Sequence, residues 1–245
     1  MTHWLDSVFA VPVIGLQWCP NLESCCHWSD VVGRWMNERG SEGDIVTVAH
    51  NKPLEWDLQF RSGFVCVLRP ATLSVQFIHP LSIVRARPVP EISVGDVRPY
   101  TVRLEGVEQL IVGLTQELAG AKALSLVRIG IMAIADMPVE QLPPGAAGLV
   151  DHLSSPWKLG LEAMDAKLTA ILEQEEEGRV RCHHMMKLNR AEGEPVAELR
   201  LDWQHLFAGP RAVSAGEVEG LIRGDVVRAL EYFQAFAEGD GGNGS

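Results

Sequence analysis

Hydrophobic and polar residues alternate along three short runs between residues 56 and 78, and turn signals at residues 61–63 and 69–72 separate the runs. Alternation with a period of two predicts an antiparallel meander with one face in a core and the other in water. The apolar residues expected on the core face are Trp56, Leu58, Phe60, Val65, Val67, Leu73, Val75 and Phe77. The polar residues expected on the open face are Asp57, Gln59, Ser74 and Gln76.

The rest of the first half predicts two more strands and two helices. Residues 11–18 and 44–49 have the composition of strands, and residues 29–39 carry an apolar stripe at helical spacing. The proline-rich residues 80–99 predict an extended connection with no element of its own. Residues 101–119 then change to a helical period and predict a long amphipathic helix.

The second half predicts a similar set of elements. Residues 124–135 are apolar on both faces, which favours a long central strand, and residues 139–155 predict a weaker helix. Residues 161–177 fit either a helix or a strand. Residues 179–203 predict a hairpin, and residues 214–237 predict a helix that begins with a capping box.

The two halves therefore have the same order of predicted elements: a strand, a short helix, an antiparallel meander and a long helix. This order predicts an α+β fold with pseudo-repeats at residues 1–121 and 122–238, in one cooperative unit, and a disordered tail at residues 239–245. We expect one curved antiparallel sheet with both long helices on one face, as in TATA-binding-protein-like or helix-grip-like folds.

Charge and hydropathy narrow the classes of partner. The formal net charge of -11 over 245 residues opposes phosphate backbones, so nucleic-acid binding is not expected. The apolar runs are too short to cross a bilayer, and the N-terminal residues lack a basic leader, so neither membrane insertion nor secretion is expected. Five cysteines, two of them adjacent, do not predict a disulfide framework. We expect a cytoplasmic protein.

Thiol and imidazole groups occur in two places. Cys25, Cys26 and His27 lie in the first half, and Cys182 and His184 lie in the second. These side chains are zinc ligands by type, but no C-x-x-C or H-x-x-x-H spacing supports a site. Buried thiols and surface histidines are the favoured interpretation, so no metal is predicted.

Polar residues on the expected open face and tryptophans near the N-terminus are candidates for a binding surface. A histidine near a carboxylate can act as a general base, but such residues are more often the solvated face of a sheet. No phosphate-binding loop or dinucleotide motif stands between a predicted strand and helix, so no cofactor is expected. The candidates for a ligand or partner surface are Trp4, Trp28, Asp57, Gln59, Gln76, Arg181, His183, Arg200 and Asp202.

Three short blocks carry a family resemblance: VPVIGLQW at the start, SLVRIGIMAIADM in the middle, and LRLDWQHLF in the last third. They resemble the corresponding blocks of a sporadically distributed bacterial family of about this length whose function is uncharacterised. The chain lacks the paired prolines that open that family's sequences. The resemblance implies a bacterial α+β protein and implies no catalytic residues.

These observations favour a non-enzymatic bacterial accessory protein that acts as a subunit or partner of a larger protein system. The alternative is a small-ligand-binding protein or a hydrolase with a cavity between the sheet and the long helices.

Overall fold

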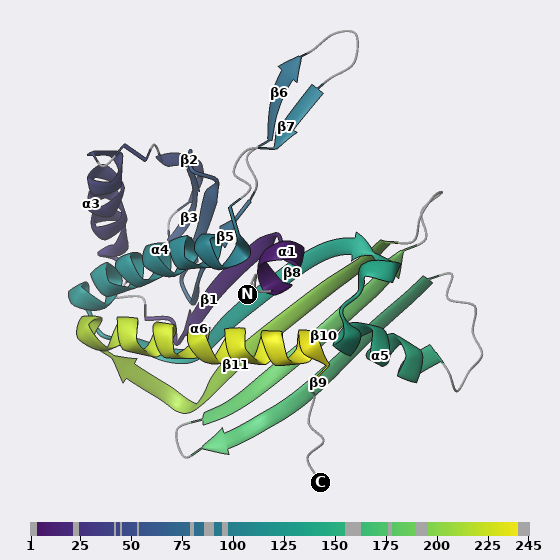
Figure 1. Ribbon diagram of the computed structural model, residues 1–245. Helices are drawn as coiled ribbons and strands as arrows, with labels where there is room; N and C mark the ends of the chain where they lie inside the picture. The colour runs from purple at the N-terminus through teal and green to yellow at the C-terminus, as the bar shows by residue number, and fades with distance from the viewer. Residues whose placement is uncertain are drawn as a thin grey trace.

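Nine antiparallel strands form one curved, open sheet in the computed structural model, in the order β2-β3-β4-β5-β1-β8-β11-β10-β9 (Figure 1). The structure describes residues 4–21, 25–41, 43–44, 46–52, 54–78, 81–85, 91–94, 98–154, 163–175, 178–189 and 196–239. The strands of this sheet are β1 (Val11–Trp18), β2 (Val46–Lys52), β3 (Glu55–Phe60), β4 (Phe64–Arg69), β5 (Thr72–Phe77), β8 (Leu124–Pro138), β9 (Ala163–Glu175), β10 (Gly178–Asn189) and β11 (Val196–Val213). The α+β class is therefore confirmed.

The described helices that cover the sheet lie on one of its faces (Figure 1). The long helices α4 and α6 pack against each other and against the central strands, and α3 packs against α4. The helices are α1 (Trp4–Val8), α3 (Trp28–Ser41), α4 (Tyr100–Ala121), α5 (Pro144–Ser154) and α6 (Ala215–Glu238), with a 3-10 turn η1 (Val139–Gln141). Within the described part of the chain, no helix is both long and apolar enough to cross a membrane.

The core lies between the sheet and the long helices. Ile131 on β8, Leu201 on β11 and Phe233 on α6 have no exposed side-chain surface. Each buries an apolar side chain, which stabilises the fold by roughly 1.5 to 3 kcal/mol relative to an exposed position. The helix α6 starts at the predicted capping box, where Glu217 accepts from the Ser214 backbone N–H at 3.0 Å.

The prediction for the middle strand of the meander was wrong about its face. Residues Phe64, Cys66 and Leu68 of β4 are buried against the helices, whereas Val65 and Val67 pair with Gln59 and Asp57 on the open face. This run is apolar on both faces, so the pattern of apolar and polar residues does not determine which face of β4 is buried. The pairing register after the turn at residues 61–63 decides which face each side chain takes.

One other segment differs from its prediction, and the structure decides the segment that was left open. Residues 80–99 contain a hairpin of β6 (Leu81–Arg85) and β7 (Glu91–Val94), which projects away from the large sheet (Figure 1). The prolines of this segment lie outside both strands, so they do not interrupt the pairing. The ambiguous residues 161–177 contain the edge strand β9 rather than a helix. Residues 240–245 of the predicted tail lie outside the described residues.

Candidate functional site

The central feature of the open face is a pair of glycines on neighbouring strands. Gly15 of β1 pairs directly with Gly130 of β8 in the middle of the sheet. A methyl group added to either glycine would meet nothing closer than 3.8 Å, and neither has a positive φ angle. The backbone therefore does not require glycine at these positions. Because glycine has no Cβ, these two positions leave backbone that another group can approach closely.

The two glycines form the floor of a recess of about 380 Å³ that spans β5, β1, β8 and β11. Its volume lies within the range of small-molecule sites, although the recess is only partly enclosed. Its polar lining consists of Thr72 and Ser74 from β5, Arg128 from β8, and Arg200, Asp202 and Gln204 from β11. Val13 and Met132 add apolar surface. The recess therefore combines charged, hydrogen-bonding and apolar groups at the centre of the open face.

Asp202 is the carboxylate that lines the recess, and it is only 8% exposed. Its Oδ2 accepts a hydrogen bond from Nε2 of Gln204 at 2.8 Å. Burial raises the pKa of Asp202, and the Gln204 hydrogen bond and the charges of His183, Arg200 and Arg128 offset part of that rise. Its environment therefore favours a further donor for the carboxylate.

Arg128 and Arg200 bring positive charge to the recess. Neither forms an ion pair with a carboxylate of the described residues. Arg200 directs Nη2 toward the sulfur of Met132, and its buried Nε has no hydrogen-bond partner in the described structure. A buried guanidinium nitrogen without an acceptor is costly, which makes it a ready donor for an incoming oxygen.

His183 and Arg181 extend this polar surface onto β10. His183 lies opposite Asp202 and Arg181 opposite Gln204, as the sequence predicted for this face. His183 Nδ1 lies 3.2 Å from Thr169 Oγ1, while its Nε2 and the Nε of Arg181 are buried without a described partner. Burial and the nearby cationic side chains lower the pKa of His183, against the opposing effect of Asp202. No hydrogen bond joins His183 to Asp202 in the described structure, so the pair does not form a ready general base.

The three polar candidates from the first half do not all lie near the recess. Gln76 of β5 pairs with Val13, a lining residue of the recess. Asp57 and Gln59 are on the open face of β3, which β4, β5, β1 and β8 separate from β11. Asp57 is also neutralised locally, because Arg69 Nη2 lies 2.6 Å from its Oδ1. The structure thus places Gln76 beside the recess but not in its lining, and leaves Asp57 and Gln59 at a distance.

The assignment of Trp28 to a surface was wrong. Trp28 is 1% exposed and packs edge-on against Trp18 with ring centroids 5.7 Å apart. Trp4 is half-buried and packs edge-on against Phe9 on the helix-covered side, so it does not contribute to the open face. Both rings bury more surface in the core than the sequence pattern indicated, because α1 and α3 pack against α4.

The thiol and imidazole candidates belong to separate environments. Cys25 is buried while Cys26 and His27 are exposed near α3. Cys182 and His184 face α6, where His184 Nε2 lies 2.9 Å from Tyr232 Oη and the ring stacks on Phe236 at 4.2 Å. Burial raises the pKa of Cys182 to about 12 and lowers that of His184 to about 4. Among the described residues, no group of three or more potential ligands is close enough to hold a metal.

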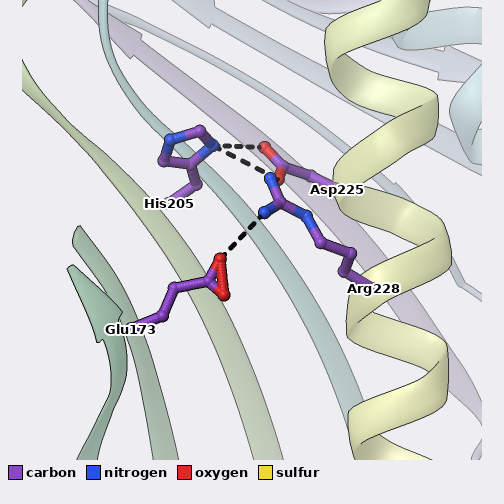
Figure 2. A network of polar contacts seen from close by, with 4 residues as sticks. All are labelled: Glu173, His205, Asp225 and Arg228. Carbon is purple, nitrogen blue, oxygen red and sulfur yellow. Dashed lines mark hydrogen bonds and ion pairs between the residues drawn. The ribbon is translucent and has the colours of Figure 1, made fainter. Parts of the chain in front are cut away.

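A partly buried polar network that the sequence pattern did not predict connects α6 to the sheet (Figure 2). His205 of β11 lies 3.0 Å from Asp225 of α6, and Arg228 bonds Asp225 at 2.8 Å and Glu173 of β9 at 3.2 Å. A charged residue within the apolar stripe of the last helix was the available signal, since Asp225 lies between Ile222 and Ala229 on that face.

This network is suited to holding the helix rather than to catalysis. His205 is 6% exposed and Asp225 1% exposed. The second ring nitrogen of His205 lies over the backbone, because a methyl group placed on Gly178 would be 3.1 Å from Nε2. Burial and the contact with Asp225 therefore hold the His205 ring between β11 and α6.

In comparisons with known proteins, no protein-family model matches the chain, and no curated protein matches it in sequence. The bacterial family resemblance stays a prediction.

Proposed function

We propose that this chain is a non-enzymatic bacterial accessory protein that docks a protein partner on the open face of its sheet. The observation that supports this most strongly is the Gly15–Gly130 pair, which forms the floor of the recess. The packing does not require glycine at either position. Glycine at both positions costs strand stability, by roughly 0.5 to 1 kcal/mol each. A partner that approaches the backbone closely would account for that cost.

The polar groups of the recess favour binding over catalysis. Arg200 has a buried donor without an acceptor, Asp202 is buried with one described hydrogen bond, and His183 is not bonded to Asp202. Groups in this arrangement can recognise a ligand by charge and hydrogen bonding. The expected cavity between the sheet and the long helices has less support, since Ile131, Leu201 and Phe233 fill that space.

We further propose that the sheet arose by duplication and that the fold is TATA-binding-protein-like or helix-grip-like. The strand order supports this proposal. Outward from the central pair of β1 and β8, the first half adds β5, β4, β3 and the extra edge strand β2, and the second half adds β11, β10 and the edge strand β9. Each half therefore places its meander strands in the same reversed order, followed along the chain by a long helix on the same face.

Affinity capture from the native host tests the docking proposal. Tagged wild-type protein should retain a partner at physiological salt, and Gly130→Leu should lose it because the side chain fills the recess. Gly224→Leu is the matched control, since Gly224 is exposed on α6 with nothing within 4 Å of an added methyl group. Recovery of the wild type alone as a monomer, or equal capture by the Gly130→Leu variant, would contradict the proposal.

A further inference from the structure

Resting on the proposed function, we propose that the recess recognises a carboxylate on an acidic peptide segment of the partner protein. Arg128 and Arg200 bind the carboxylate, and Asp202 accepts an N–H from the peptide backbone that carries it. The Gly15–Gly130 floor allows that backbone to lie against the sheet.

The positive charge of the recess supports the first part of this inference, that the ligand group is a carboxylate. Arg128 and Arg200 line the recess and Arg181 lies beside it, on a chain whose formal net charge is -11. These guanidinium groups have no described carboxylate partner, and the Nε atoms of Arg200 and Arg181 are buried without an acceptor. A planar guanidinium matches the two oxygens of a carboxylate, so an acidic side chain supplies the missing acceptors.

Asp202 determines which kind of anion fits. The Asp202 carboxylate repels a ligand that offers only acceptors. It is 8% exposed and has one described hydrogen bond, from Gln204. A peptide carries N–H donors beside its acidic group, so it satisfies the arginines and Asp202 together. A nucleic-acid backbone offers repeated phosphates and needs many cations to neutralise them, which the acidic chain opposes.

The glycine floor indicates how the peptide lies. At Gly15 and Gly130 the sheet presents backbone without a Cβ, between the side chains of Ser74 on β5 and Gln204 on β11. A flat backbone segment can lie there in van der Waals contact, and its acidic side chain then lies beside Arg128 and Arg200, which line the same recess.

Chemical-shift titration of the full chain tests the inference with small probes of defined chemistry. The probe is N-acetylglutamic acid α-amide, its neutral isostere is N-acetylglutamine amide, and inorganic phosphate and a short oligothymidylate are the competing anions. The amide signals of Gly15 and Gly130 should shift saturably with the acidic probe and not with the neutral one. Arg128→Gln and Arg200→Gln should each weaken binding by about tenfold, the loss expected for one charge-assisted contact.

Arg34→Gln is the matched control, because Arg34 lies on α3 with its side chain 63% exposed and paired to Glu117. It removes the same charge and should leave the titration unchanged. Thermal midpoints of all variants confirm that they are folded. Shifts of equal size with phosphate, with the oligonucleotide or with the neutral isostere would overturn the carboxylate assignment, as would no shift at all. Loss of partner capture in Gly130→Leu alone, with the arginine variants unaffected, would leave the docking proposal standing without this inference.

Discussion

His205 on β11 donates a hydrogen bond from Nδ1 to Asp225 on α6 at 3.0 Å, and both side chains are almost completely buried. The contact joins the C-terminal helix to the centre of the second half of the sheet. Arg228 extends it to Glu173 on β9, so one network ties the helix to two strands (Figure 2).

We expect Asp225→Ala to destabilise the protein by about 1 to 3 kcal/mol, because it leaves the buried Nδ1–H of His205 without its acceptor. The partly exposed Arg228 keeps its ion pair with Glu173. Denaturant unfolding measures the change. Glu231→Ala is the control, since it removes an exposed carboxylate from the same helix and should change stability by less than about 0.5 kcal/mol. A similar small effect for Asp225→Ala would show that the network contributes little.

Gly106 and Gly224 should respond to alanine with opposite signs. A methyl group on Gly106 of α4 would lie 2.5 Å from Phe64 Cζ, whereas nothing lies within 4 Å of one on Gly224 of α6. Gly106→Ala should cost about 1 to 3 kcal/mol by overpacking. Gly224→Ala should stabilise by up to about 1 kcal/mol through helix propensity. Thermal unfolding compares the midpoints of Gly106→Ala and Gly224→Ala with that of the wild type. If both substitutions raise the midpoint, the Phe64 side chain moves aside at little cost and the overpacking prediction is wrong.

Acid should weaken the fold through His184. Burial lowers the pKa of His184 in the folded state to about 4, below the ordinary value of 6.5. Between these pH values the unfolded chain binds a proton that the folded chain does not, so stability falls as pH drops from 6.5 toward 4, by on the order of 3 kcal/mol. His184→Gln should remove most of this slope in urea titrations at several pH values. An unchanged slope would assign the effect to other groups.

The two halves of the chain, residues 1–121 and 122–238, should fold only together. Cutting between residues 121 and 122 would separate β1 from β8 and α4 from α6, which are paired or packed in the intact chain. Each half would expose a sheet edge and an apolar helix face. We predict one cooperative unfolding transition for the whole chain and insoluble or molten halves. Two separate transitions, or a half with dispersed amide signals, would contradict this.

Local sequence patterns were sufficient to predict most of the helices and strands. Alternation along residues 56–60 and 72–77 identified strands β3 and β5 and their buried faces, and the spacing of apolar residues identified α4 and α6. The hairpin of β10 and β11 was also predicted, and with it the neighbours His183 and Asp202. These features depend on residues close in sequence, where a period or a turn determines the geometry.

The recess on the open face could not be predicted from local patterns, because it depends on contacts between residues far apart in the sequence. Gly15 and Gly130 are 115 residues apart in the chain, and only the pairing of β1 with β8 makes them neighbours. The face of Val65 and Val67 followed from strand register, because that run is apolar on both sides. Trp28 is buried because α3 packs against α4, and His205 meets Asp225 because α6 crosses β11. Periodicity determines which residues share a face, but tertiary pairing decides what that face contacts.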